Sequence, residues 1–398
     1  MVVLSANIPH YHYLAEALNR EGLLDCYHTS WSLFPGQSPP RWLPAQLRRR
    51  LETRRLSGVP RNAVRNHLLP EAMQKLLLAA GGSPSFAHEI NNRMFDRRVG
   101  KTFGHAKIYH FVNTLGAWSA ERARSQGLVV VCDTRQEHPE FQRAVLLKEA
   151  QKREVSIVPD LRMERRMIRE LSFSHHVIVP SEYCKRTLVA YGCPAEHISI
   201  LPYGVDLEMF KPVQRRPRAG PTRLLFVGTL SLRKGVLYLL EAMRLLNSRK
   251  FELTCIGTVD PSIKRLLQPF KSDFVFIPSM PKVDLVRSYA TFDAFILPSL
   301  ADAFPLVILE AAASGLPVIA TDHVGSADWL RKTGGGLIVP SGQTAALADA
   351  IEKLSDPDLR MSMSRANIEA RGSLHWKHYE SNLVSIYRRA ILPLAGAA

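Results

Sequence analysis

Cysteine is scarce in this chain, and its cysteines form no recognisable pattern. Five of them are scattered over 398 residues, and no two form a C-x-x-C pair. An odd number at wide spacing argues against a disulfide framework and against a cysteine-based zinc site. The sequence therefore predicts free thiols in a reducing compartment.

Long apolar runs without charge are also missing. The most apolar stretch, residues 295–321, contains Asp302 and Glu310 and therefore does not predict a transmembrane helix. The chain starts with no basic segment ahead of a continuous apolar core, which argues against a signal peptide. We therefore expect a cytoplasmic protein, with the inner face of the plasma membrane as a further place of action.

Acidic residues are too few to balance the basic ones, and the net charge is +16. Residues 1–222 carry +12 of this excess, and residues 41–65 contain eight arginines against Glu52 alone. One interpretation is a solvated helical face. The other is contact with an anionic membrane or substrate, which the nearby Trp31 and Trp42 favour. No DNA- or RNA-binding motif accompanies the charge, so we expect no nucleic-acid partner.

The length and the apolar content of 46% predict a globular chain of two domains. Short β-branched segments alternate with helix-like segments, and this rhythm runs through both halves of the chain. We expect strands at 1–5, 23–27, 107–112, 128–132, 177–179, 198–201, 224–227, 251–256, 274–276, 295–297, 318–321 and 337–339. We expect helices at 11–19, 71–80, 185–191, 236–246, 262–267, 282–289, 306–313, 344–354, 359–370 and 375–391. A further helix is expected after the loop DTRQEHPEFQ and ends at residue 149.

The boundary between the domains is expected at residues 206–221, which are rich in proline, arginine and glycine. The sequence thus predicts two doubly wound α/β domains, residues 1–205 and 222–374. Residues 375–398 contain a last amphipathic helix. In such folds ligands bind at the carboxyl ends of the strands.

Two acids lie in the segment 295–321, which predicts a strand, a loop, a helix and another strand. Asp302 is in the loop, and Glu310 is on the helix that begins at Pro305. A carboxylate that faces a cleft accepts hydrogen bonds from a sugar diol. The alternative interpretations are that Asp302 caps the helix and that Glu310 faces solvent.

A diphosphate-binding loop is predicted at residues 225–240. A buried strand ends at Gly228, and a short polar loop then presents Arg233 and Lys234 before a helix begins. Glycine permits close backbone approach, the helix N-terminus favours anions, and the two cations neutralise them. The loop is neither a Walker loop nor G-x-G-x-x-G, so a solvated Arg-Lys pair is the alternative.

A histidine follows the predicted strand 128–132. His138 lies in the loop DTRQEHPEFQ, at the end of a strand that should face the site. His10 and His110 lie near the ends of other strands and compete with it for a functional role. Spacing alone does not choose among these three histidines.

Four segments carry a resemblance to a known family: VIVPS, ILPYGVDLEMF, LFVGTLSLRKG and LPSLADAFPLVILEAAASGLPVIAT. In this order and spacing, over about residues 170–345, they resemble the family 4 retaining glycosyltransferases of the GT-B fold. The resemblance implies two Rossmann-like domains facing a central cleft, with a C-terminal helix that crosses back to the first domain. It implies a nucleotide-sugar donor on the second domain and an acceptor on the first. It also implies no metal and no other cofactor, because the Arg-Lys pair takes the place of the cation.

The resemblance assigns roles to the residues already singled out. Arg233 and Lys234 match the family's diphosphate-binding pair. Glu310 matches the second acid of the motif, which holds the donor ribose. Asp302 matches the first acid, which contacts the donor sugar and is usually the longer glutamate.

The same resemblance extends to backbone groups and to the acceptor side. Phe304, Leu306 and Val307 lie in a segment whose backbone N–H groups approach the sugar and phosphate, and Gly228 belongs to the donor loop. Arg135 and His138 resemble acceptor-side residues. His138 is also a catalytic candidate beside Asp302 and the Arg-Lys pair, and His10 is a further acceptor-side candidate.

The sequence therefore predicts a retaining, metal-independent glycosyltransferase. It would move a hexose-type sugar from a nucleoside-diphosphate sugar to a hydroxyl of a glycan or lipid-linked acceptor, in cell-surface polysaccharide or lipopolysaccharide synthesis. Peripheral contact with an anionic membrane is expected from the basic first half. The alternatives are a nucleotide-sugar epimerase of the same architecture and a non-catalytic anion- or membrane-binding protein.

Overall fold

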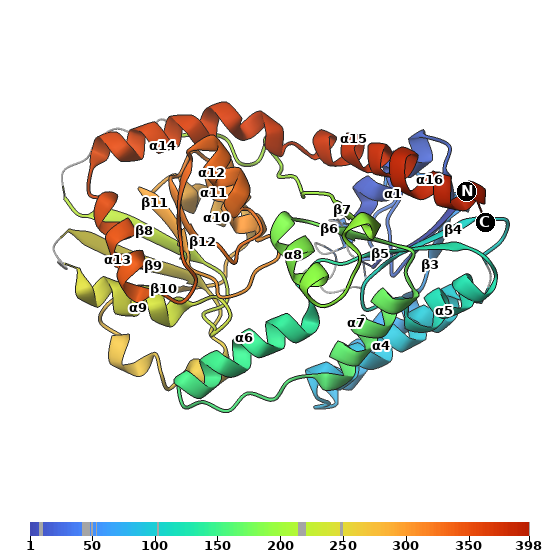
Figure 1. Ribbon diagram of the computed structural model, residues 1–398, viewed down its shortest axis with the longest axis horizontal. Coiled ribbons are helices and arrows are strands. Elements are labelled where there is room, and N and C mark those ends of the chain that lie inside the picture. The colour runs from blue at the N-terminus through green and yellow to red at the C-terminus, as the bar shows by residue number, and fades with distance from the viewer. Residues whose placement is uncertain are drawn as a thin grey trace.

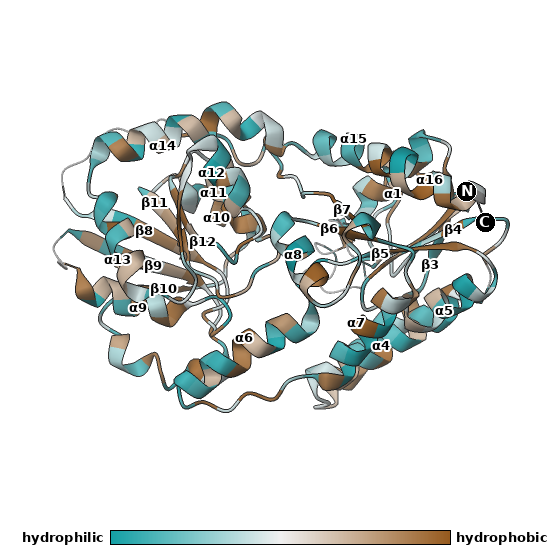
Figure 2. Cartoon of the chain, in the orientation of Figure 1, coloured by the Kyte–Doolittle hydropathy of each residue, from teal (hydrophilic) through white to brown (hydrophobic). Residues whose placement is uncertain are grey.

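The structure is a computed structural model, and it describes residues 1–7, 11–41, 48, 51–52, 54–101, 103–213, 220–246 and 250–397. Its strands form two separate parallel sheets, which lie side by side with helices on both faces (Figure 1). The strands of both sheets are mainly hydrophobic, whereas the helices around them are mixed (Figure 2). The predicted doubly wound α/β architecture is confirmed.

The first sheet has seven strands in the order β3-β2-β1-β4-β5-β6-β7, and every neighbouring pair is parallel. Its core consists of aliphatic and aromatic side chains, as the burial of a covered parallel sheet requires. The strands are β1 (Val2–Ser5), β2 (Leu24–Thr29), β3 (Val64–Asn66), β4 (Ile108–Val112), β5 (Val129–Asp133), β6 (His176–Val179) and β7 (Ile198–Ile200).

The second sheet has six strands in the order β10-β9-β8-β11-β12-β13, again all parallel. The chain order reverses at β8. Of the two central strands, β11 is fully buried and β8 is buried except at Arg223. The strands are β8 (Thr222–Val227), β9 (Phe251–Gly257), β10 (Val275–Pro278), β11 (Ala294–Leu297), β12 (Val318–Thr321) and β13 (Gly336–Val339).

The helices follow the strands in the alternating manner expected of such a chain. Those of the first half are α1 (Tyr11–Arg20), α3 (Leu68–Ala79), α4 (Pro84–Val99), α5 (Ala117–Ser125), α6 (Pro139–Lys152), α7 (Leu161–Phe173) and α8 (Glu182–Ala190). Those of the second half are α9 (Val236–Leu245), α10 (Lys282–Tyr289), α11 (Leu306–Ala313), α12 (Ala327–Thr333), α13 (Thr344–Lys353) and α14 (Pro357–Ala370). No helix of the described part of the chain is long and apolar enough to cross a bilayer.

The last segment of the chain crosses back to the first sheet, as predicted (Figure 1). It consists of α15 (Trp376–Ile386), a π-helical stretch (Tyr387–Ile391) and α16 (Leu392–Ala397). Tyr13 of α1 stacks on Trp376 at a centroid distance of 4.7 Å. Arg20 and Glu380 form an ion pair between the same two helices. The aromatic face of α15 belongs to the hydrophobic core of the first sheet.

Some predicted elements differ from the structure. The helix expected at 262–267 is replaced by two short 3₁₀ turns, Pro261–Ile263 and Gln268–Phe270. Each of these turns carries a proline near its start, and proline offers no N–H for continuing an α-helix. Helices α4, α5, α7 and α12 and strand β3 were not predicted. Of the expected linker, residues 214–219 lie outside the described residues.

Helix α6 joins the two sheets along the lower edge of the molecule in Figure 1. It starts at the end of β5, but Ala150 near its C-terminus packs into the core of the second sheet. There Tyr238 of α9 donates a hydrogen bond to Glu149 Oε2 at 2.6 Å. Arg153 Nη2 also contacts Glu241 of α9, at 3.2 Å. The sheets are therefore held together from below by α6 and from above by the segment from α14 to α15.

Candidate functional site

The predicted diphosphate loop connects β8 to α9 at the carboxyl end of the second sheet. The loop turns tightly at Gly235, whose φ is +64° and where a Cβ would meet the carbonyl oxygen of Pro298 at 1.9 Å. No described side chain caps the N-terminus of α9. Uncapped N–H groups attract anions, so this helix end offers a place for phosphate oxygens next to Arg233 and Lys234.

Asp302 lies against the two cations of this loop. Its carboxylate forms an ion pair with Lys234 Nζ, and Arg233 Nη1 lies 3.5 Å from Asp302 Oδ1. Ser299 Oγ donates a hydrogen bond to Asp302 Oδ2 at 3.4 Å. Asp302 is buried and Lys234 is partly buried. Burial lowers the pKa of Lys234, an effect that the charge of Asp302 opposes. The structure therefore brings three predicted residues together as one charged cluster.

The backbone after Asp302 leads into the N-terminus of α11. Pro305 is the N-cap residue, with φ −70°, and α11 begins at Leu306, so Asp302 does not cap this helix. No described side chain caps α11 either, which leaves the first N–H groups, those of Leu306 and Val307, pointing out of the helix end. The ring of Phe304 packs edge-on against Tyr203 of the first half at a centroid distance of 5.8 Å.

Glu310 is buried on α11 and contacts α10 rather than the cluster around Asp302. Its Oε2 accepts a hydrogen bond from the hydroxyl of Tyr289 at 3.1 Å, and its Oε1 lies 3.1 Å from Lys282 Nζ. The solvent-facing alternative for Glu310 is therefore wrong. Both carboxylate oxygens are engaged, and a diol that used this group would have to displace the exposed Lys282.

The loop after β5 brings a further acid to the cluster. Glu137 is buried, and burial raises its pKa, while the charges of Arg233 and Asp302 act on it in opposite directions. Gln142 Nε2 donates to Glu137 Oε1 at 2.7 Å. Glu137 Oε2 has no hydrogen-bond partner among the described residues. The sequence analysis missed this residue, because only the packing of the two halves places it near Arg233.

His138 caps the start of α6 and lies between that helix and α8. Its backbone N–H donates to Thr187 Oγ1 at 3.0 Å, and its ring stacks on Tyr191 at 4.4 Å. Burial lowers the pKa of His138 and so favours the neutral ring. Its Nδ1 is buried without a hydrogen-bond partner among the described residues.

The other acceptor-side candidates occupy different places. Arg135 is half-buried near Tyr11 and Tyr203; burial raises the pKa of both tyrosines, and the charge of Arg135 partly opposes this. His110 is fully buried within β4, where Nδ1 contacts the hydroxyl of Tyr387 at 2.7 Å, so it ties the C-terminal segment to the first sheet. His10 lies outside the described residues.

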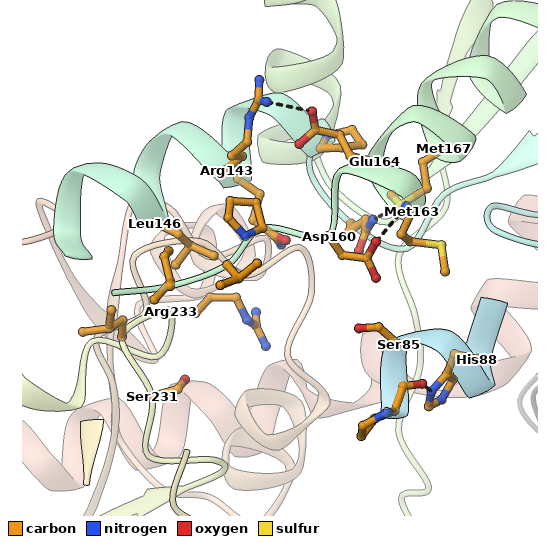
Figure 3. A pocket seen from close by; sticks show the side chains of 18 of the residues that line it. Ser85, His88, Arg143, Leu146, Asp160, Met163, Glu164, Met167, Ser231 and Arg233 are labelled. Carbon is orange, nitrogen blue, oxygen red and sulfur yellow. Dashed lines mark hydrogen bonds and ion pairs between the residues drawn. The ribbon is translucent and has the colours of Figure 1, made fainter. Parts of the chain in front are cut away.

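A cavity of about 810 Å³ lies between the two sheets, at the ends of β4, β5 and β8. Arg233 and Ser231 border it from the second half, whereas Ser85 and His88 of α4 border it from the first (Figure 3). Arg233 is the predicted site residue that lines this cavity. The neighbouring Asp302 and Glu137 are buried, and the side chain of Lys234 is 13% exposed.

One wall of the cavity belongs to a loop with a strained backbone. Thr114, after β4, has a φ of +90°, which is unusual for a residue with a branched side chain. Buried Glu170 holds this loop by accepting hydrogen bonds from the N–H groups of Thr114 and Gly116, the latter at 2.9 Å. Arg166 Nη2 in turn contacts Asp96 Oδ2 at 2.7 Å. These buried charges fix the shape of the first-half side of the cavity.

The predicted arginine cluster is partly committed to internal contacts. Arg54 binds Glu71 of α3 through Nη1 at 2.6 Å and Nη2 at 3.3 Å. Arg55 donates to the carbonyl oxygen of Phe34 at 3.1 Å. Arg61 and Arg65 are exposed, and residues 49–50 lie outside the described residues. Among the described residues, no three His, Cys, Asp or Glu side chains gather as metal ligands would.

Sequence comparison identifies two family matches, one in each half of the chain. Residues 81–209 match the family described as Glycosyltransferase Family 4. Residues 221–356 match Glycosyl transferases group 1. Together the matches span about two thirds of the chain and include the loop with Arg233 and the segment with Asp302.

Individual relatives and structures agree with these matches. The chain is 28% identical to the amylovoran biosynthesis glycosyltransferase AmsK of Erwinia amylovora, over 58% of this chain and 62% of the relative. The chain spans between about half and three fifths of the length of the curated relatives it matches.

Among solved structures, sucrose-phosphate synthase from Thermosynechococcus elongatus superposes with a TM-score of 0.65 at 21% identity, covering 98% of this chain and 99% of that one. HepE of Anabaena, in complex with UDP-glucose, gives 0.62 at 14% identity, covering 97% and 99%. These likenesses concern the fold, and they confirm the predicted GT-B architecture. The chain therefore belongs to the family 4 glycosyltransferases, also described as glycosyl transferases group 1.

Proposed function

We propose that this protein transfers a hexose-type sugar, with retention of anomeric configuration, from a nucleoside-diphosphate sugar to a hydroxyl acceptor. The observation that carries the proposal is the cluster of Arg233, Lys234 and Asp302 beside two uncapped helix N-termini. This arrangement supplies positive charge and N–H donors for a diphosphate, and a carboxylate within reach of the sugar attached to it.

The donor is held by the second half of the chain. Arg233 and Lys234 bind the diphosphate, and Asp302 contacts the sugar. Glu310 gives up its ion pair with Lys282 and accepts hydrogen bonds from the ribose hydroxyls instead. Gly228 at the end of β8 allows the backbone to approach the nucleotide. UDP-glucose, the ligand named for HepE, is the first donor to test.

Transfer proceeds on the face of the sugar that the diphosphate leaves. The bond between the anomeric carbon and the phosphate oxygen breaks, and a bond to the acceptor oxygen forms on the same face. The departing phosphate oxygen takes the acceptor proton. Arg233, Lys234 and the helix N-terminus stabilise the charge that develops on the diphosphate, and closure of the two halves around the bound donor would exclude water. No metal or other cofactor is required in this scheme.

The acceptor is held by the first half, in the cavity bordered by α4 and the Thr114 loop. Arg135 and His138 are the acceptor-side residues, with His10 as a further candidate. We infer a glycan or lipid-linked acceptor in cell-surface polysaccharide or lipopolysaccharide synthesis, in keeping with the name of AmsK. Contact with an anionic membrane face would bring the enzyme to such an acceptor.

The proposal is tested by incubating the purified protein with UDP-, GDP- and ADP-sugars and with glycan or lipid-extract acceptors. We expect release of one nucleoside diphosphate, and NMR of the product should give the anomeric configuration of the donor. Lys234→Ala and Glu310→Ala should lose transfer while their circular dichroism stays unchanged. Wild-type rates in both variants would overturn the site. A changed sugar nucleotide without acceptor or diphosphate release would instead identify an epimerase.

A further inference from the structure

Helix α3 presents an apolar face to solvent. Leu76 is 67% exposed, and Leu68 and Leu69 are each 47% exposed. The exposed positions of the helix are 68, 69, 72, 75, 76, 78 and 79, which cover one broad side of it, and Lys75 is the charged residue among them. A surface helix normally places polar side chains on such a face, so this one is shaped for an apolar contact.

The apolar surface continues around the turn into α4. Leu78 is 40% exposed and Phe86, in the first turn of α4, is 46% exposed. Helices α3 and α4 pack against each other as a hairpin. Ser85 and His88 of the same turn of α4 line the cavity (Figure 3). The α3–α4 turn therefore lies next to the first-half rim of the cleft, where an acceptor would enter.

The segment of the chain that contains this face is strongly basic. Residues 41–101 contain thirteen lysines and arginines against four aspartates and glutamates. The acid on α3 is already neutralised, because Glu71 pairs with Arg54 at 2.6 Å and with Lys75 at 3.2 Å. On α4, Glu89 pairs with Arg93 at 2.6 Å. These pairs leave the segment with a surplus of positive charge.

We propose that the exposed face of α3, with the α3–α4 turn, docks into the interface of an anionic lipid bilayer. An interfacial helix combines a leucine-rich face with nearby cations, which is the combination found here. The basic surplus favours a lipid surface over a second copy of this positively charged chain, which it would repel. The inference rests on the proposed function only in one respect: docking would deliver the cleft to a lipid-linked acceptor.

Vesicle flotation of the full chain tests the docking surface. The wild type should float with phosphatidylcholine vesicles that contain about 30–50% phosphatidylglycerol, because this share of anionic lipid gives the vesicle a strong negative surface potential. It should not float with pure phosphatidylcholine vesicles. Leu69→Glu with Leu76→Glu should reduce the bound fraction about tenfold or more, because it buries charge in place of apolar side chains. The matched control is Leu245→Glu with Val275→Glu, at positions 65% and 59% exposed on the second half. It should float like the wild type.

A second readout avoids charged substitutions. A nitrobenzoxadiazole dye is attached to Leu76→Cys in a background in which Cys26 and Cys193, the partly exposed thiols, are serine. Its emission should shift to the blue when anionic vesicles are added. The same dye at Leu245→Cys should not respond.

Three outcomes would overturn the docking surface. In the first, the α3 variant floats as well as the wild type. In the second, neither protein floats with anionic vesicles. In the third, the wild type sediments as a dimer, the α3 variant sediments as a monomer, and lipid has no effect on either. The last result would assign the face to a second copy of the chain. Binding of nucleoside diphosphates is measured on the same preparations. The α3 variant should keep it, so a failure of docking is distinguished from a failure of the proposed function.

Discussion

Substitution of Lys234 is the most informative single change, because its ammonium has one anionic partner without the donor and another with the donor bound. In the structure its ammonium pairs with Asp302, and in the donor complex it faces the diphosphate. Lys234→Ala removes this charge, but it leaves Arg233 Nη1 3.5 Å from Asp302 and Ser299 Oγ 3.4 Å from it. The buried Asp302 therefore keeps partners, and we expect the fold to survive.

The size of the effect follows from the burial of the site. The side chain of Lys234 is 13% exposed, so its contact with a phosphate would be shielded from water. A hydrogen bond to a charged group contributes about 1.5–3 kcal/mol, which corresponds to roughly 10- to 150-fold weaker binding of the nucleoside diphosphate. The loss in kcat should be about 10²- to 10³-fold, as for other preorganised donors that stabilise a developing charge.

The assay is calorimetric titration of the nucleoside diphosphate together with the rate of sugar transfer. Lys250→Ala is the matched control, because Lys250 also pairs with a carboxylate, Glu352, at 2.6 Å, but precedes the amino end of β9, away from the cleft. It should bind and transfer like the wild type. Equal affinity and rate in Lys234→Ala and Lys250→Ala would refute the role of Lys234.

Three further predictions concern Asp302, Tyr289 and the buried histidines. Asp302→Asn removes a negative charge from the anion site, so in titration it should bind the free nucleoside diphosphate about tenfold more tightly than the wild type. Its rate of sugar transfer should fall. Weaker binding of the nucleoside diphosphate would contradict this prediction. Tyr289→Phe removes a hydrogen bond of about 1 kcal/mol to Glu310, and we expect a donor KM raised about fivefold with kcat little changed, which steady-state kinetics would reveal; an unchanged KM would count against the ribose role. The third prediction concerns pH. Burial lowers the pKa of four histidines to about 4 or about 3, whereas they titrate near 6.5 when unfolded: His12, His28, His67 and His176. Their contribution to stability is present above pH 6.5 and is lost as the pH falls towards 4, at about 1.4 kcal/mol per pH unit and histidine. Burial raises the pKa of Glu170 to about 7, so the contribution of this group to stability grows as the pH falls and offsets one of the four histidines. Urea unfolding should thus show a net loss of about 4 kcal/mol between pH 6 and pH 5, and constant stability over that range would be the contrary result.

The sequence was sufficient for elements whose buried faces are apolar. Helix α10 and helix α11 occur at the predicted residues, because proline marks their starts and apolar side chains their buried sides. Helix α4 escaped prediction for the opposite reason. Its buried face contains polar groups, such as Asp96, which accepts a hydrogen bond from the distant backbone N–H of Ser119. A search for apolar periodicity does not detect such a helix. Helix α7 does have an apolar side, and the prediction missed it.

The candidate site divides in the same way. The loop with Arg233 and the acid at 302 follow from local signals, namely the glycines, the adjacent cations and a helix start. Their mutual contact is a tertiary fact, since 68 residues separate Lys234 from Asp302. Glu137 has no local signal at all, because its position near Arg233 depends on how the two halves pack. Glu310 was predicted as an acid of the site, but its engagement by Lys282 was not.

The central claim is that the cleft binds a nucleoside diphosphate through Arg233 and Lys234. It is tested most directly by thermal shift with UDP, GDP and ADP, each in the presence of EDTA, on the wild type and on Lys234→Ala. The account predicts that one of the three raises the melting temperature of the wild type and has a much smaller effect on the variant. No shift with any of them, or equal shifts in both proteins, would contradict it.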